Sequence, residues 1–172
     1  MPEVKAYKIT EAGRAKLQAE LDDRIANTRN EIAREIDFAR SYGDLSENAE
    51  YTEAKRKQTE NEERIAFLQD ILAIAVVVDE SEINTDQVSI GNRVRVFNHA
   101  KNREYTYSIV GVQEANPFEG SISDESPVGK ALIGAVVGMD VDAVLPNGSV
   151  VKYTVLEIML DRDEAEGENA DA

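Results

Sequence analysis

The sequence predicts an α+β protein, in which an N-terminal antiparallel coiled-coil hairpin of two α-helices precedes a small domain of strands and one short helix. Three observations lead to this prediction. Residues 11–75 contain no proline, and their apolar side chains recur at steps of three and four, as on one face of a helix. Gly43 is a helix breaker in the middle of this run. From about residue 80 onward, short runs of alternating or β-branched residues replace the helical pattern.

The first helix is expected from about residue 11 to residue 40. Thr10 and Gly13 suit a helix start, but the glutamate that completes a capping box at the fourth position is missing. A narrow apolar stripe follows, with Thr28 filling its one gap. The apolar residues of this stripe are Leu17, Leu21, Ile25, Ile32, Ile36 and Ala39.

The second helix is expected after a turn at residues 41–44. Its seam alternates steps of three and four, which is a heptad pattern with two polar residues in the middle. Arms of ~30 residues would each be ~45 Å long, with too little core to form a globular domain, so the hairpin should project into solvent. The seam residues are Tyr51, Ala54, Gln58, Asn61, Ile65, Leu68, Leu72 and Ala75.

The second half is expected to form a separate domain over residues 80–160, after a hairpin unit of residues 1–79. Strands are expected at residues 93–97, 104–110 and 149–158, with a turn signal at residues 146–148 before the last of them. Ser126 as N-cap and Pro127 at the first helical position predict a short helix that ends at Gly134. The acidic tail, residues 161–172, is expected to be disordered.

Composition and charge exclude several classes of protein and site. The 34 acidic and 19 basic side chains give a net charge of −15, which does not suit general nucleic-acid binding through phosphates. The absence of cysteine excludes disulfides and thiolate chemistry, and the single histidine, His99, excludes a multi-histidine metal site and is expected in a turn. No apolar run reaches the ~20 residues of a membrane span. We therefore expect a soluble, cytoplasmic protein without a membrane partner.

The densest chemistry lies at the hairpin tip, residues 43–51. Asp44 and Glu47 are three residues apart, so they meet on one face of a helical turn. Magnesium is typically held by one or two carboxylates with waters and substrate phosphates, so this pair could bring part of a magnesium site to a partner. The alternative is a capping box, with Asp44 as N-cap and Glu47 at the third helical position. Spacing alone favours the cap, and the two interpretations can coexist in part.

Two blocks of sequence resemble a known family. Residues 43–51, Gly-Asp-Leu-Ser-Glu-Asn-Ala-Glu-Tyr, resemble the tip signature of the bacterial GreA/GreB transcript cleavage factors. Residues 126–134, Ser-Pro-Val-Gly-Lys-Ala-Leu-Ile-Gly, followed by Gly138, resemble the signature of that family's C-terminal domain. The blocks occur in the family's order, and the two-domain layout matches over about residues 5–160. The basic residues beyond the tip are few, and in this respect the sequence is more similar to GreA than to GreB.

The resemblance implies an FKBP-like second domain that docks on RNA polymerase at the rim of its secondary channel, while the coiled coil enters the channel. The tip then stimulates the polymerase's own hydrolysis of backtracked RNA, so that an arrested complex can resume; the factor alone is not a nuclease. Magnesium would be shared with the polymerase, with none expected in the free protein. The nascent RNA 3′ end would be reached through the polymerase, and a monomer is expected.

The resemblance also assigns roles to residues of the tip. Asp44 and Glu47 match the acids that position magnesium and the attacking water. The positions that support the tip are Asn48, Glu50 and Tyr51, of which Tyr51 lies on the seam and is expected to pack there.

Two further sets of residues match the family's contact surfaces. A basic patch that contacts RNA, for which a solvated charged face is an equal alternative, consists of Arg40, Lys55, Arg56 and Lys57. The loop that docks on the polymerase contains Glu125, Ser126 and Pro127, although the latter two also serve to start the short helix.

Three other functions compete with transcript cleavage. A related inhibitor would block the polymerase channel with an altered acidic tip, but the block at residues 43–51 is intact. A prolyl isomerase needs an aromatic-lined pocket, whereas aromatic residues make up 6% of the chain and tryptophan is absent. Phe118 is expected to pack in the core, with the anchoring of a loop as the alternative. A coiled-coil adaptor without chemistry would tolerate replacement of Asp44 and Glu47 at a cost of ~1 kcal/mol of capping.

Overall fold

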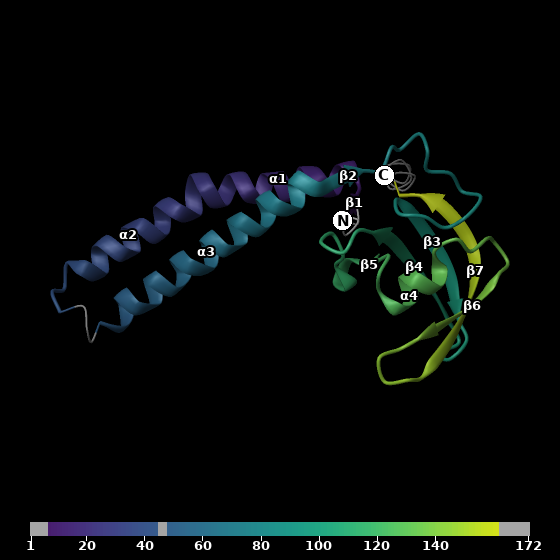
Figure 1. Ribbon diagram of the computed structural model, residues 1–172. Helices are drawn as coiled ribbons and strands as arrows, with labels where there is room; N and C mark the ends of the chain where they lie inside the picture. The colour runs from purple at the N-terminus through teal and green to yellow at the C-terminus, as the bar shows by residue number, and fades with distance from the viewer. Residues whose placement is uncertain (1–6, 45–47, 162–172) are drawn as a thin grey trace, which may run out of the picture. The chain divides into compact units, whose positions relative to one another are not determined.

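A helical hairpin and a mixed β-sheet form the two parts of the computed structural model, which describes residues 7–44 and 48–161 (Figure 1). Chain contacts divide these residues into two compact units, one of residues 14–75 and one of residues 7–13 with 76–161. The second junction lies close to the boundary suggested near residue 79. Within the described ranges, no helix has both the length and the apolar character needed to cross a bilayer.

Two long arms lie side by side in the hairpin (Figure 1). The first arm consists of α1 (Glu11–Asp23), the π-helix η1 (Arg24–Thr28) and α2 (Arg29–Arg40), and the second arm is α3 (Ala49–Ile74). All of the predicted seam residues of the second arm are buried or half-buried. The predicted hairpin of amphipathic helices is therefore confirmed, since its apolar stripes have only each other to pack against.

The apolar stripe of the first arm departs from the prediction at Ile25, which is 37% exposed. The cause is the π-helix, in which one extra residue is accommodated in a turn, so that the face presented to the other arm shifts by one position. Arg24, which is half-buried, takes the place of Ile25 after the buried Leu21, whereas Thr28 is half-buried on the stripe as predicted. The placement of Ile25 on the stripe was therefore wrong.

The second unit contains a five-stranded sheet in the order β5-β4-β3-β7-β6. Its neighbouring strands are antiparallel except for the parallel pair β4 and β5. A separate two-stranded sheet joins β1 to β2. The strands are β1 (Tyr7–Ile9), β2 (Ala75–Val77), β3 (Asn92–Asn98), β4 (Arg103–Val110), β5 (Ser121–Ser123), β6 (Asp140–Val144) and β7 (Val150–Leu160).

One face of the large sheet and the short helix α4 (Pro127–Leu132) form the core of this unit. Alternate residues of β3 are buried, and Val94, Val96 and Val155 are fully enclosed together with Leu132 of α4. This arrangement confirms the predicted α+β class. Phe118, however, is entirely exposed on the 3₁₀ turn η2 (Pro117–Glu119), so its expected place in the core was wrong. Gly120, with φ of 76°, turns the chain directly after it into β5.

A residue far along the chain completes the cap of α1. Thr10 Oγ1 accepts the N–H of Gly13 at 2.9 Å, as an N-cap side chain does. Glu114 Oε2 in turn accepts the N–H of Thr10 at 3.2 Å, and Glu114 Oε1 accepts the Thr10 hydroxyl. A capping-box glutamate would make the first of these bonds from position 13. A Cβ at Gly13 would lie 1.9 Å from Glu114 Oε1, so the glycine leaves the space that this carboxylate fills.

Candidate functional site at the tip of the helical hairpin

The tip begins where Gly43 ends the first arm. Its φ of 97° is a left-handed conformation that suits glycine, and its N–H donates to the carbonyl of Arg40 at 3.3 Å. The chain therefore leaves the axis of α2 at this residue. Asp44 follows directly and is exposed. Glu47 lies outside the described residues, as do the two residues before it.

Asn48 holds the ends of both arms. Its Oδ1 accepts the N–H of Tyr51 at 3.1 Å, which makes Asn48 the N-cap of α3, and its Nδ2 donates to the carbonyl of Ala39 in α2 at 2.8 Å. The capping box with Asp44 as N-cap is therefore wrong, because the helix starts four residues later than that interpretation requires. One amide side chain thus fixes the register of the two arms where the acidic turn joins them.

The acidic residues of the tip supply oxygen ligands of the kind that magnesium prefers. Within residues 7–44 and 48–161, no three histidine, aspartate or glutamate side chains gather so that they could hold a metal ion. An ion at Asp44 would consequently need ligands from Glu47, from water or from a partner. The donor chemistry of the tip, carboxylate oxygen, therefore fits magnesium.

The other two residues predicted to support the tip have different surroundings. Tyr51 is half-buried and packs against Ile32, Ile36 and Ala54 in the seam. The guanidinium of Arg40 lies 6.0 Å from the centre of the Tyr51 ring. Glu50 is exposed in the first turn of α3, where a negative charge is favourable beside the helix N-terminus.

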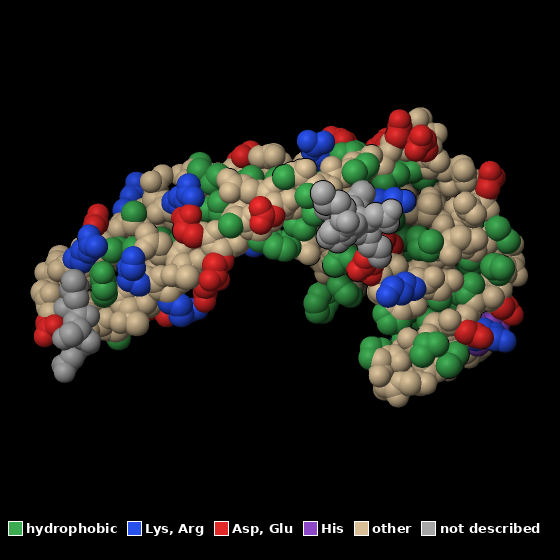
Figure 2. Space-filling view, in the orientation of Figure 1, with side chains coloured by type: hydrophobic (Ala, Val, Ile, Leu, Met, Phe, Trp, Pro, Cys, Tyr) green, Lys and Arg blue, Asp and Glu red, His purple; other side chains and the backbone are tan. Residues whose placement is uncertain are grey.

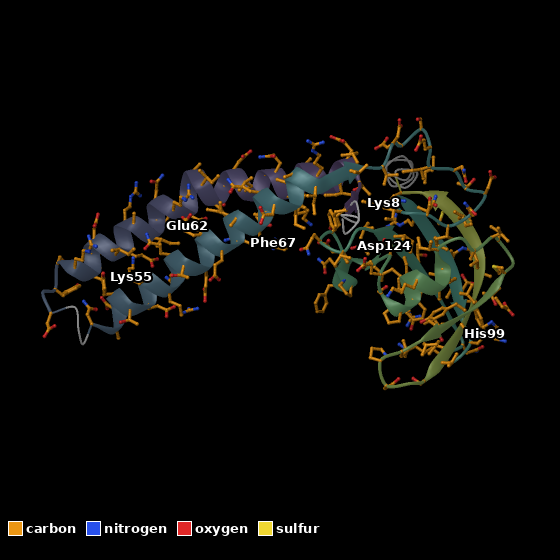
Figure 3. All side chains as sticks on the ribbon, in the orientation of Figure 1. Lys8, Lys55, Glu62, Phe67, His99 and Asp124 are labelled. Carbon is orange, nitrogen blue, oxygen red and sulfur yellow. The ribbon has the colours of Figure 1, made fainter. Side chains whose placement is uncertain are left out.

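The structure separates the four cations of the predicted basic patch into two kinds. Arg56 is paired with Glu53 at 2.5 Å and also with Glu60, and Lys57 is paired across the arms with Glu35 at 2.8 Å. Lys55 instead donates to the amide oxygen of Gln58 at 2.5 Å (Figure 3). Basic and acidic side chains are interspersed over this face of the hairpin (Figure 2). Half of the patch therefore has its charge matched by carboxylates, and its contact with RNA stays a prediction.

The predicted docking loop precedes α4 in the second unit. Ser126 is the N-cap of α4: its Oγ accepts the N–H of Gly129 at 3.0 Å and donates to the carbonyl of Ser123 at 2.6 Å. Pro127 is the first residue of the helix, and Glu125 stands exposed just before this cap. The loop is therefore held in a fixed conformation that presents the Glu125 side chain to solvent.

A groove of about 680 Å³ lies beside this loop. Its apolar lining comes from Val78, Ile90, Val112 and Ile133, and its charged rim comes from Lys8, Asp124, Glu125 and Lys130. Figure 3 labels Lys8 and Asp124 on this unit. Two acidic and two basic side chains therefore border an apolar lining, a combination that is typical of a surface to which another protein binds.

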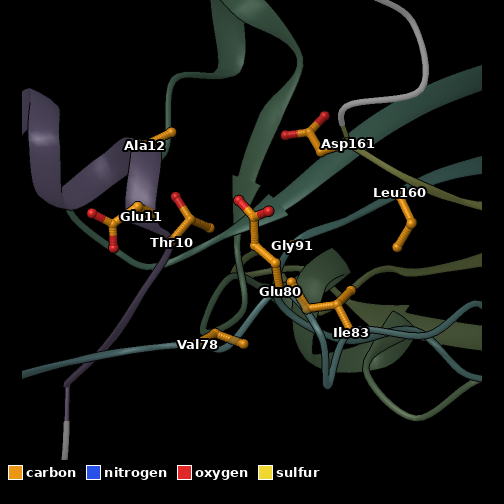
Figure 4. A pocket seen from close by; sticks show the side chains of 9 residues that line it. All are labelled: Thr10, Glu11, Ala12, Val78, Glu80, Ile83, Gly91, Leu160 and Asp161. Carbon is orange, nitrogen blue, oxygen red and sulfur yellow. The ribbon is translucent and has the colours of Figure 1, made fainter.

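A second cavity of the same unit, about 230 Å³ in volume, lies next to the start of α1. Figure 4 shows the carboxylates of Glu11, Glu80 and Asp161 around it. Asp161 accepts a hydrogen bond from Ser108 Oγ at 2.9 Å and lies 3.9 Å from Arg93 Nε, so part of the acidic charge here is matched.

His99 lies in the turn between β3 and β4, as expected. Its Nε2 is 2.7 Å from Thr154 Oγ1, and that hydroxyl donates to Asp140 at 2.6 Å. Nε2 therefore carries the proton and donates to Thr154, which is a structural role on an exposed surface.

A polar cluster lies in the middle of the hairpin. Glu20 accepts two hydrogen bonds of 2.8 Å from Arg64 and one of 2.8 Å from Arg24. The bonds from Arg64, followed by those from Arg24, lower the pKa of Glu20 from its usual 4.5 to about 2. Arg24 also donates to Asn61 Oδ1 at 3.0 Å. This hydrogen bond satisfies the buried Asn61 side chain, which lies in the polar middle of the seam opposite the π-helix.

We expect the Glu20→Gln substitution to lower the free energy of unfolding of the hairpin by about 1 kcal/mol at pH 7, after screening of these partly exposed groups by solvent. Because folding lowers the pKa of Glu20, its contribution is complete above pH 4.5 and is lost as the pH falls towards 2. Urea unfolding followed by circular dichroism should show the difference from the wild type shrinking between pH 5 and about pH 2. Glu62→Gln, which removes an exposed pair with Arg29, is the control with a smaller effect.

Two aromatic residues next to the tip were not singled out from the sequence. Phe38 and Tyr42 are 61% and 64% exposed, respectively. The signal that could have found them is their position, because two bulky rings fall off the apolar stripe immediately before the acidic block. Glu114, the partner of Thr10, carried no signal in the sequence at all.

Models of known protein families match both parts of the chain. The family model described as "Transcription elongation factor, N-terminal" matches residues 7–77, and that described as "Transcription elongation factor, GreA/GreB, C-term" matches residues 83–160. The chain is 46% identical over 158 residues to transcription elongation factor GreA of Clostridioides difficile (strain 630), with coverage of 92% of this chain and 99% of the relative. It is 48% identical over 158 residues to GreA of Clostridium botulinum (strain Alaska E43 / Type E3), with coverage of 92% and 98%.

Among solved structures, that of the transcription factor Gfh1 is 26% identical, with coverage of 90% of this chain and 97% of that chain and a TM-score of 0.44. The two family models, by contrast, together span the hairpin and the sheet unit. Together with the sequence identity over most of the length of its relatives, they show that the chain belongs to the GreA/GreB family of transcription elongation factors.

Proposed function

We propose that this elongation factor binds RNA polymerase and stimulates the polymerase's own cleavage of nascent RNA in backtracked complexes. The observation that carries the proposal is the construction of the tip. An exposed Asp44 stands on a glycine turn, and a separate residue, Asn48, joins the two arms and caps α3. Gly43 turns the chain and Asn48 caps α3, so neither of these two tasks falls to Asp44.

The two units have separate tasks in this proposal. Glu125 and the groove beside it would dock on the polymerase at the rim of its secondary channel, where Ser126 keeps the loop in place. The hairpin would then bring its tip through the channel to the polymerase's catalytic centre. Its two arms are joined at the tip by Asn48, so the ends of α2 and α3 would arrive in a fixed register.

At the catalytic centre, Asp44 and Glu47 would position a magnesium ion that the polymerase shares. Bound there, the ion would activate a water molecule and stabilise the charge that develops on the phosphate. The acidic residues contribute negative charge that attracts the cation and hydrogen-bond acceptors that orient the water. In this proposal the hydrolytic site belongs to the polymerase, and the factor supplies only part of its ligands.

The test is RNA cleavage in stalled, backtracked elongation complexes with magnesium. Addition of the factor is expected to shorten the RNA from its 3′ end, at a rate that rises with factor concentration and then saturates. The factor incubated with the same RNA and no polymerase should leave it intact. Slower elongation without shortening would contradict the proposal and indicate a channel-blocking inhibitor. The comparisons favour neither that alternative nor an adaptor.

A further inference from the structure

An aromatic pair stands exposed at the end of the first arm, one turn before Asp44. Phe38 is 61% exposed and Tyr42 is 64% exposed. Their ring centres are 5.2 Å apart and their planes are perpendicular. Each ring therefore limits the motion of the other, and both keep a face open to solvent.

The fold of the hairpin does not account for these rings. Phe38 follows Ile36 by two residues, so it points about 160° away from the buried seam that Ile36 shares with α3. Tyr42 lies beyond the last residue of α2. Neither ring belongs to the cluster of seam residues near the tip, and more than half of each side chain lies in water, which is unfavourable for apolar surface.

Two arginines close to the pair, Arg34 and Arg40, form no ion pair among the described residues. Arg34 lies one helical turn before Phe38 on the same face, is exposed, and forms no ion pair with any residue in the described ranges. Arg40 stands over the Tyr51 ring and likewise has no carboxylate within ion-pair distance among those residues. By contrast, Arg56 and Lys57 of the second arm are paired with glutamates. Arg34 thus places a positive charge that no described carboxylate matches one helical turn from Phe38.

We propose that Phe38 and Tyr42 form a stacking platform for a base of single-stranded nucleic acid, with Arg34 placed to contact its backbone. Isolated aromatic faces beside unpaired arginines are what single-strand binding requires. A docked protein would instead need a continuous apolar patch, and here the two rings are bordered by the charged residues Asp37 and Arg40. That the strand is the extruded 3′ segment of the RNA rests on the proposed function.

The experiment combines a change in the protein with a change in the RNA. The double substitution Phe38→Leu/Tyr42→Leu keeps apolar bulk and helix propensity but removes both π faces. Phe67→Leu is the matched control, because Phe67 is a partly exposed ring of the same hairpin about 27 Å along α3 from its start. Each full-length protein is added to backtracked complexes whose extruded nucleotides carry either normal bases or abasic riboses. Circular dichroism checks that all variants are folded.

We expect the double substitution to slow stimulated cleavage roughly fivefold or more on RNA with normal bases, and to have no effect on abasic RNA. Phe67→Leu should match the wild type on both RNAs. Equal slowing on both RNAs would overturn the proposal, because the rings would then contact the polymerase rather than a base. Unchanged rates on both RNAs would overturn it as well.

A second measurement separates this proposal from the proposed function. The extruded RNA carries 4-thiouridine, and photocrosslinks to the hairpin are mapped on the wild type, the ring variant and Asp44→Asn. Crosslinks at Phe38 or Tyr42 that survive Asp44→Asn support the platform even if the wild type stimulates no cleavage, in which case only the proposed function fails. Stimulated cleavage without such crosslinks and without dependence on the base overturns the platform and leaves the proposed function standing.

Discussion

Asp44→Asn is expected to reduce stimulated RNA cleavage about 100-fold or more, while the affinity for RNA polymerase stays within about twofold of the wild type. Asparagine keeps the size of the side chain but lacks the charge that holds a divalent cation. The cap of α3 is made by Asn48, so the substitution leaves the helix start intact. Cleavage rates at saturating factor and a separate binding titration measure the two effects. Glu47→Gln should behave in the same way.

The control for this prediction is Asp37→Asn, which removes an exposed carboxylate from the same end of α2. It should leave cleavage unchanged. Because Asp44→Asn weakens ion binding, a higher magnesium concentration should restore part of its rate and have less effect on the wild type. Loss of binding and cleavage together would show that the tip docks the factor rather than assists the chemistry.

Gly129→Ala is expected to destabilise the sheet unit by about 3 kcal/mol and to weaken binding to the polymerase. A Cβ at Gly129 would lie 1.9 Å from the carbonyl oxygen of Ser123 and 2.9 Å from Ser126 Oγ. The first of these atoms belongs to the backbone, so β5 and α4 must move apart to admit the methyl group. That movement breaks the cap at Ser126 and displaces Glu125.

Thermal unfolding measures the loss of stability, and a binding titration with RNA polymerase measures the loss of docking. Lys130→Ala, at the next and exposed position of α4, is the control for stability alone, because Lys130 lines the proposed docking groove, and it should change the free energy of unfolding by less than about 0.5 kcal/mol. A Gly129→Ala protein with wild-type stability would show that the β5–α4 contact is looser than this distance implies.

The local sequence pattern was sufficient to predict the elements that are stabilised by contacts between residues close together in the chain. The heptad seam from Tyr51 to Ala75, the N-cap at Ser126 and the alternation of β3 were all predicted, because each depends on side chains a few residues apart. Three-residue strands such as β1 and β5 were not predicted. They are too short to show a period, and they exist because a partner strand supplies their hydrogen bonds.

The candidate site was predicted in part for the same reason. The acidic residues of the tip are adjacent in the chain, and their resemblance to a known family is visible without a structure. The residue that caps α3 was assigned wrongly, since Asp44 and Asn48 are both good N-caps and only the position of the helix start chooses between them. Phe38 and Tyr42 became visible once their exposure was known.

The sequence by itself determined two helical arms, a glycine turn bearing acids and an α+β second part, because periodicity and turn residues act over short distances. Tertiary structure alone decided that Ile25 leaves the seam at a π-helix, where the polar cluster of Glu20, Arg24 and Asn61 takes its place. It also decided that Glu114 completes the cap of Thr10 across 104 positions of sequence. No local pattern encodes such a contact, because the free energy that selects it comes from pairing partly buried polar groups that meet only after the chain has folded.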